Sequence, residues 1–210
     1  MSIRFDVVAL ADPGWRSRAV DTLRDGGVVA LPTDTFYGLA VCGRDAAALE
    51  SLNRIKRKSA GSPILMLAAD LDQARQILRP ETPHLDRLAD RFWPGPLTLL
   101  GPRQEGWPEA IAVGRQTVAV RVPAAEVPRT VARELGVPIS GVSANRHGAS
   151  PPVTVDAIDL DGIDLAVDGG ACPGGQASTL LDLASDPPRI LREGEIGRDA
   201  IESVVGRLVP

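Results

Sequence analysis

Two lysines stand one residue apart in the stretch RIKRKSAGSP, and they are the only lysines in this chain. All other members of its set of 23 basic residues are arginines, so Lys56 and Lys58 stand out against a strong preference for arginine. A lysine ammonium is a compact charge with three rotatable donors, which suits phosphate oxygens where the planar fork of arginine does not fit. The structural alternative also stays open, because cations are stabilised near the C-terminal end of a helix by its dipole.

A second polar cluster follows a short apolar run in ALPTDTFYGLAV, where Thr33, Asp34 and Thr35 come directly after residues 28–31. Ligands bind at strand ends in open α/β sheets, because loops converge there and leave backbone groups unpaired. The same residues are also good turn formers, so a plain turn after the strand is the competing interpretation.

Three later stretches place polar groups on or just after apolar runs. Arg121 lies inside the alternating run VAVRVP, and a buried arginine must meet an anion, either a ligand carboxylate or an internal Asp or Glu. Ser143 and Asn145 follow the run VPISGV, while Ser178 and Arg192 lie in STLLD and ILREG. Each of these signals is weak alone.

The elements that must position these residues alternate along the chain. Helical periodicity covers residues 14–25, 45–58, 70–78, 83–92 and 125–135, and strand-like runs cover 28–31, 63–68, 117–123, 164–167, 177–182 and 189–192. Some strands follow one another closely, so we expect an α/β fold with an open, twisted, mixed sheet and flanking helices. Residues 147–153 and 168–177 read as loops of functional length, and the first of them is the predicted lid over a site.

Composition excludes several classes of protein. The net charge of −4 argues against a surface that attracts nucleic acid everywhere, so any positive site must be local. Charged residues interrupt the first ten residues, and no apolar run reaches the roughly 18 to 20 residues of a membrane span, which predicts a cytoplasmic protein without membrane contact. Cys42 and Cys172 lie far apart and read as small buried side chains, and the common nucleotide-binding loops are missing from the sequence.

The motifs occur in one order: PTDTFYGL, then K-x-K with Pro63 seven residues after Lys56, then PGPLTLL, VAVRVP, SAN, STLLD and ILREG. In this order they resemble the YrdC-like family, the threonylcarbamoyl-AMP synthases, over about residues 14–196. The resemblance implies a mixed sheet curled around a large positively charged cavity. It also implies one domain over residues 1–210, without the further C-terminal domain of the longer members.

The activity that the resemblance implies is the condensation of L-threonine, bicarbonate and ATP into threonylcarbamoyl-AMP with release of pyrophosphate. A separate transferase complex then uses this product to modify adenosine 37 of tRNA. ATP would serve as a substrate accompanied by Mg²⁺. Direct binding of tRNA would be weak at most.

The resemblance also implies roles for individual residues. ATP-binding residues would be Lys56, Lys58, Ser62, Thr117, Ser143, Asn145, Ser150 or its neighbour Pro151, and Arg192. Threonine-binding residues would be Thr35, Arg121, Gly141 and Ser178. The catalytic set, which stabilises charge, would be Lys56, Lys58, Arg121, Ser143 and Asn145.

The sequence departs from the family pattern at four positions. Lys58 stands where the family has arginine, which keeps the charge and loses the bidentate fork. Leu67 replaces a threonine-contacting histidine of the longer members, Val142 a frequent threonine and His147 a small serine. Two alternatives stay open. One is an RNA-binding module that uses the 54–58 cluster and the positive cavity, which few aromatic residues and the negative charge disfavour. The other is a relative with the same nucleotide site and another acyl substrate.

Overall fold

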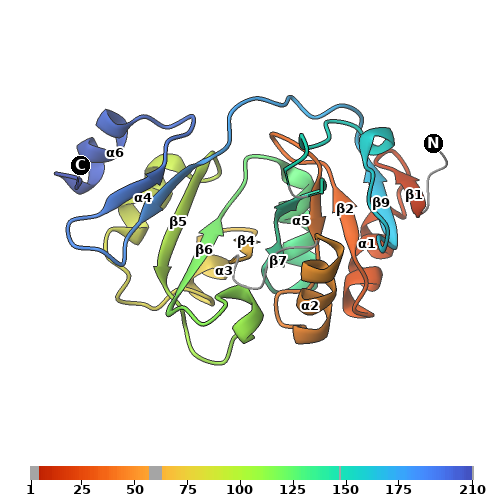
Figure 1. Ribbon diagram of the computed structural model, residues 1–210, viewed down its shortest axis with the longest axis horizontal. Helices are drawn as coiled ribbons and strands as arrows, with labels where there is room; N and C mark the ends of the chain where they lie inside the picture. The colour runs from red at the N-terminus through yellow and green to blue at the C-terminus, as the bar shows by residue number, and fades with distance from the viewer. Residues whose placement is uncertain (1–4, 57–62, 147, 210) are drawn as a thin grey trace.

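The computed structural model describes residues 5–56, 63–146 and 148–209, which form two mixed β-sheets with helices packed against them (Figure 1). The first sheet has the order β1 (Asp6–Ala9), β9 (Leu165–Asp168), β2 (Val29–Leu31), β3 (Gly38–Ala40), β8 (Val142–Ser143). The second has the order β11 (Arg189–Arg192), β10 (Thr179–Asp182), β5 (Leu97–Pro102), β6 (Thr117–Arg121), β4 (Leu65–Leu67), β7 (Ile139–Ser140). The predicted mixed α/β architecture is confirmed, although the strands divide between two sheets.

The chain passes between the sheets at Gly141, inside a run that reads as one strand in the sequence. Before it, Met66 of β4 pairs with Ser140; after it, Leu39 of β3 pairs with Val142. Gly141 itself donates a hydrogen bond to the carbonyl of Leu65 at 2.8 Å. Another, longer crossing is made by residues 169–178, which run from β9 to β10 (Figure 1).

Six α-helices lie among the described residues: α1 (Trp15–Arg24), α2 (Ala46–Ile55), α3 (Leu71–Arg75), α4 (Leu85–Phe92), α5 (Glu126–Leu135) and α6 (Arg198–Val205). Two 3-10 turns cover Glu109–Ile111 and Val155–Ala157. Asp45 caps α2 by accepting a hydrogen bond from the Ala48 amide at 3.0 Å, and Asp70 caps α3 in the same way through Gln73. α2 buries Leu49 and Leu52 fully, each stabilising the fold by about 1.5–3 kcal/mol.

Two hydrophobic clusters fill the space behind the sheets. One gathers residues from both sheets, α2 and α4, including the fully buried Tyr37. The other lies where α1 packs against α5 and the first sheet, around Leu23 and Val131. β1 and α6 lie at opposite ends of the molecule (Figure 1).

Most predicted elements are confirmed with small changes at their ends. No element was predicted for β1, β3, β5 or α6, although the sequence showed the apolar run PGPLTLLG that covers most of β5. The prediction that both cysteines are buried is correct for Cys172 and wrong for Cys42, which is half-buried. Within the described residues, every helix is too short or too polar to cross a bilayer.

Candidate functional site

A cavity of about 410 Å³ opens between the two sheets, where several distant segments of the chain meet. Its lining comes from residues 33–38 after β2, from Lys56, from β4, from the end of β6, from the Gly141 crossing, from residues 177–178 just before β10 and from the end of β11. The charged side chains in this lining are Lys56, Arg121, Arg192 and Asp34. Among the described residues the cavity therefore presents three cations and one carboxylate.

The segment after β2 is a well-formed turn that also faces the cavity. The Thr33 hydroxyl accepts hydrogen bonds from the amides of Thr35 and Phe36, at 3.1 and 3.2 Å, and donates to the Phe36 carbonyl at 2.7 Å. These bonds confirm the turn interpretation. Because Thr33 to Gly38 line the cavity, the turn and the strand-end site are the same structure.

Tyr37 fastens this turn to the crossing segment that follows β9. Its hydroxyl donates to the Gly170 carbonyl at 2.9 Å and accepts from the Gly169 amide at 3.1 Å. Burial raises the pKa of Tyr37 to about 12, since removal from water disfavours the charged phenolate. The cavity wall is thus held by a neutral hydroxyl between two segments far apart in sequence.

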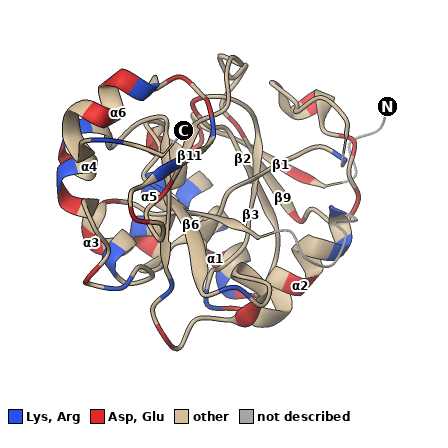
Figure 2. Ribbon diagram, turned by 60° about the vertical axis from the view of Figure 1, so that its left-hand side comes forward, with Lys and Arg blue, Asp and Glu red and all other residues tan. Residues whose placement is uncertain are grey.

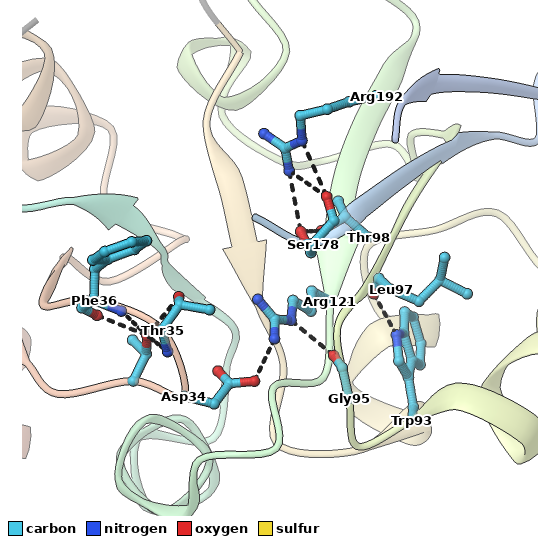
Figure 3. A network of polar contacts seen from close by, with 11 residues as sticks. Asp34, Thr35, Phe36, Trp93, Gly95, Leu97, Thr98, Arg121, Ser178 and Arg192 are labelled. Carbon is cyan, nitrogen blue, oxygen red and sulfur yellow. Dashed lines mark hydrogen bonds and ion pairs between the residues drawn. The ribbon is translucent and has the colours of Figure 1, made fainter. Parts of the chain in front are cut away.

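Arg121 meets an internal carboxylate, which answers the question left open by the sequence. Its Nε donates to the Gly95 carbonyl at 2.8 Å, and its Nη2 forms an ion pair with Oδ2 of Asp34 (Figure 3). Only 5% of Arg121 is exposed, so burial lowers its pKa, and the Asp34 carboxylate opposes that change. The second oxygen, Asp34 Oδ1, is buried and finds no hydrogen-bond partner among the described residues, and an unsatisfied buried acceptor costs about 1–3 kcal/mol.

Arg192, the last residue of β11, is held by Ser178. Its Nε and Nη2 donate to the Ser178 carbonyl at 3.1 and 2.9 Å, and Nη2 also reaches the Ser178 hydroxyl at 3.1 Å (Figure 3). Thr98 completes the group through a 2.8 Å hydrogen bond with the same hydroxyl. Partial burial lowers the pKa of Arg192, although the side chain keeps exposed surface. The acceptors named here are uncharged, so the guanidinium is oriented by them without being neutralised.

Lys56 directly follows the last residue of α2 and reaches across to the Ser143–Asn145 segment. Its ammonium donates to the Ser143 carbonyl at 2.5 Å, to the Asn145 carbonyl and to Asn145 Oδ1 at 3.3 Å. Asn145 in turn donates from its amide to the carbonyls of Arg146 and Ala149. Lys56 thus stands at the helix end, as the sequence predicted, while its ammonium binds the Ser143–Asn145 segment and brings its charge to the cavity.

Eight of the predicted site residues line this one cavity: Thr35, Lys56, Arg121, Gly141, Ser143, Asn145, Ser178 and Arg192. Thr117 and Ser150 are outside the lining in the described structure: Thr117 begins β6, and Ser150 is exposed beside Pro151, which does line the cavity. Lys58, Ser62 and His147 lie outside the described residues. The binding roles of all these residues stay predictions.

Sequence reasoning missed the pairing of Asp34 with Arg121 and the contribution of Thr98. The position of Asp34 between two threonines at a strand end was a signal for the first. Thr98 lies in the apolar run PGPLTLLG and gave no such signal. Leu67 and Val142, two of the departures from the family pattern, both line the cavity.

Comparison with known proteins gives consistent results. Residues 21–194 match the family model Sua5/YciO/YrdC, described as telomere recombination. The threonylcarbamoyl-AMP synthase of Pyrococcus abyssi is 35% identical over 92% of this chain and 58% of its own length. That of Thiobacillus denitrificans is 37% identical over 81% of this chain and 90% of its own length.

A solved structure extends the similarity to three dimensions. The crystal structure of P. abyssi Sua5 complexed with L-threonine superposes with a TM-score of 0.89 at 34% identity, covering 98% of this chain and 62% of that one. The chain spans little more than half the length of the P. abyssi and Bacillus subtilis synthases that it matches.

Proposed function

Because this chain belongs to the Sua5/YciO/YrdC family, we propose that it is a threonylcarbamoyl-AMP synthase. It would join L-threonine, bicarbonate and ATP into threonylcarbamoyl-AMP and release pyrophosphate. The product would pass to a tRNA-modifying transferase complex that forms N6-threonylcarbamoyladenosine. The observation that carries this proposal is the convergence of three cations from distant segments on one cavity of about 410 Å³.

The cavity suits substrates that each carry an anionic group. A triphosphate, an amino-acid carboxylate and a bicarbonate each need cationic or hydrogen-bonding partners when they leave water. Arg121 ends β6 and Arg192 ends β11, both in the second sheet, and Lys56 reaches the cavity from the residue after α2. Three separate cations can hold the anionic groups of more than one substrate.

On the amino-acid side, we assign Thr35, Arg121, Gly141 and Ser178 to L-threonine. Arg121 would take the carboxylate, since its fork suits bidentate binding. The register pairing of Leu67 with Arg121 places an apolar side chain beside that carboxylate site. The threonine methyl group would have a matching surface there.

On the nucleotide side, we assign Lys56, Ser143, Asn145 and Arg192, together with Lys58, Ser62, Thr117 and Ser150. Lys56 and Arg192 would stabilise the charge that develops on the phosphates. The amine of threonine and the carbamate oxygen are the nucleophiles of the reaction, so the protein has to position reactants and stabilise charge.

Mg²⁺ enters this proposal only as a companion of the ATP phosphates. No group of three or more His, Cys, Asp or Glu side chains that could hold a metal occurs in the described parts of the chain. The one carboxylate in the described lining, Asp34, is engaged with Arg121. A metal held mainly by phosphate oxygens is the usual arrangement for Mg²⁺ with nucleotides.

The test is pyrophosphate release from ATP, measured with L-threonine and bicarbonate present and with each omitted in turn. We expect release to require both, and mass spectrometry to identify threonylcarbamoyl-AMP as the product. Release that continues without L-threonine would contradict the proposal and favour a different acyl substrate. An Arg121→Gln variant provides the matched inactive control.

A further inference from the structure

The cavity contains one carboxylate whose hydrogen bonding is incomplete. Asp34 uses Oδ2 to pair with Arg121, whereas Oδ1 is buried and accepts no hydrogen bond from the described residues. Arg121 is also incompletely used, because its hydrogen bonds to the described residues come from Nε and Nη2 and leave Nη1 over. A positive group and a negative group therefore stand in contact, each with an unused hydrogen-bonding atom (Figure 3).

This arrangement is complementary to a free α-amino acid. An amino-acid zwitterion carries a carboxylate and an ammonium on the same carbon atom, so its two charges lie within a few bonds of each other. A guanidinium binds the carboxylate well, and a carboxylate is the natural acceptor for the ammonium. When an amino acid enters the cavity, the ion pair can give up its one internal contact. The guanidinium can then bind the ligand carboxylate, and the carboxylate can bind the ligand ammonium.

A purely structural role explains the pair less well. If Asp34 served only to neutralise Arg121, its second oxygen would be expected to find a backbone or hydroxyl donor, as buried carboxylates usually do. The adjacent Thr33 hydroxyl instead bonds within its own turn, to Thr35 and Phe36. The turn around Asp34 is thus complete without using Asp34 Oδ1.

We propose that Asp34 binds the α-ammonium group of the amino-acid substrate while Arg121 binds its carboxylate. In the structure, Asp34 pairs with Arg121 and so keeps that buried cation partnered. The incoming carboxylate competes for the guanidinium, and Asp34 turns its free oxygen toward the ammonium beside it. This inference rests on the proposed function, since it assumes that an amino acid enters this cavity.

The experiment compares two ligands that differ only in the amine. L-threonine and its deamino analogue 3-hydroxybutyrate are titrated by calorimetry into the wild-type chain, Asp34→Asn and Asp34→Glu. We expect the wild-type chain to prefer L-threonine by about tenfold or more, as a charge-assisted hydrogen bond to the ammonium provides. Asp34→Asn should reduce this preference to about twofold or less, and Asp34→Glu, which keeps the charge, should recover part of it.

The affinities of Asp34→Asn for the two ligands separate three possible roles of Asp34. An equal loss of affinity for both ligands in Asp34→Asn would overturn the proposal and leave Asp34 as a support for Arg121. A gain of affinity for both would also overturn it, because Asp34 would then be a competitor only. Absence of L-threonine binding to the wild-type chain would instead count against the proposed function. Circular dichroism of Asp34→Asn, which has nearly the shape of aspartate, verifies that the comparison is made on folded protein.

Discussion

The cavity between the sheets and a surface depression beside α4 have similar volumes, about 410 and 370 Å³, and both contain arginines. They are assembled in opposite ways. The depression is lined by a single stretch of chain, Arg75, Pro80, Thr82, His84, Leu85, Asp86 and Arg87, whereas the cavity draws on segments from Thr33 to Arg192. Volume alone therefore does not mark a site in this molecule.

The two regions also differ in how their charged side chains are paired. In the depression, Arg75 donates to Asp72 at 2.8 Å and to Asp86 at 2.9 Å, and these carboxylates raise its pKa. Figure 2 shows such acidic and basic neighbours along α3 and α4. In the cavity, burial lowers the pKa of Arg121 and of Arg192. Locally paired charges neutralise one another in water, whereas cations gathered from afar into a partly desolvated cavity gain from an anionic ligand.

The largest effect should come from removing a cavity arginine. Arg121→Gln should lower kcat/KM for L-threonine about 100-fold, as loss of a buried charged partner commonly does. It should also destabilise the fold by about 3 kcal/mol, because Asp34 is left buried and unpaired. Steady-state kinetics and urea unfolding measure the two effects.

Two variants sharpen this result. Asp34→Asn combined with Arg121→Gln removes the unpaired charge, so stability should recover while activity stays low. Arg75→Gln in the depression should change kcat/KM by less than about twofold, since exposed ion pairs contribute little. Equal losses of activity in Arg75→Gln and Arg121→Gln would break the distinction between the two regions.

Lys56→Ala should weaken ATP binding by about 10- to 100-fold, the range expected when a charged hydrogen-bond donor is lost. Its ammonium also donates to the backbone of Ser143 and Asn145, so some stability should be lost with it while the fold remains. Calorimetry with ATP and thermal unfolding read the two consequences separately. Arg87→Ala in the depression is the matched control and should leave ATP affinity unchanged; unaltered ATP affinity in Lys56→Ala would remove this lysine from the nucleotide site.

The pH dependence of Tyr37 tests how the cavity wall is held. Its pKa in the fold is about 12, above the ordinary value near 10, so the neutral hydroxyl is favoured by folding. This contribution is fully present below pH 10 and is lost as pH rises toward 12, on the order of 3 kcal/mol in all. Tyr37 is the only tyrosine, so absorbance at about 295 nm follows it directly. A midpoint near pH 10 in folded protein would disprove the buried hydroxyl, and Tyr37→Phe should show no such absorbance change.

Much of the fold could be predicted from local pattern. Periodicity located α1, α2 and α5 to within a few residues at each end. Each helix buries one apolar stripe, and capping or helix-breaking residues mark its ends. β1 and β3 were missed since each has only three or four residues and takes its identity from neighbours distant in sequence. α6, with one fully buried side chain, gave a weak pattern.

The candidate site was predictable through the order of its motifs rather than through any one motif. Arg121 inside VAVRVP demanded an anion, but only the folded chain brings Asp34 to it across 87 positions. The run VPISGV, residues 137–142, read as one β-like stretch, and periodicity could not show that the chain changes sheets at Gly141. That crossing depends on tertiary packing against β4, which no local pattern reports.

The crossing at Gly141 gives the last and smallest prediction. A Cβ placed there would lie 2.7 and 2.8 Å from the two Cδ atoms of Leu67, so Gly141→Ala should destabilise the fold by about 1–3 kcal/mol. Combining it with Leu67→Ala removes the clash, and a double-mutant cycle measured by urea unfolding should show a favourable coupling energy. Gly38→Ala is the control on the same cavity wall: its Cβ would meet ordinary contacts of 3.5 Å or more, so its effect should be small. Leu67 pairs with Arg121 in the sheet, so the contact between Gly141 and Leu67 is part of the cavity wall. Additive effects of Gly141→Ala and Leu67→Ala on the free energy of unfolding would contradict tight packing of this wall.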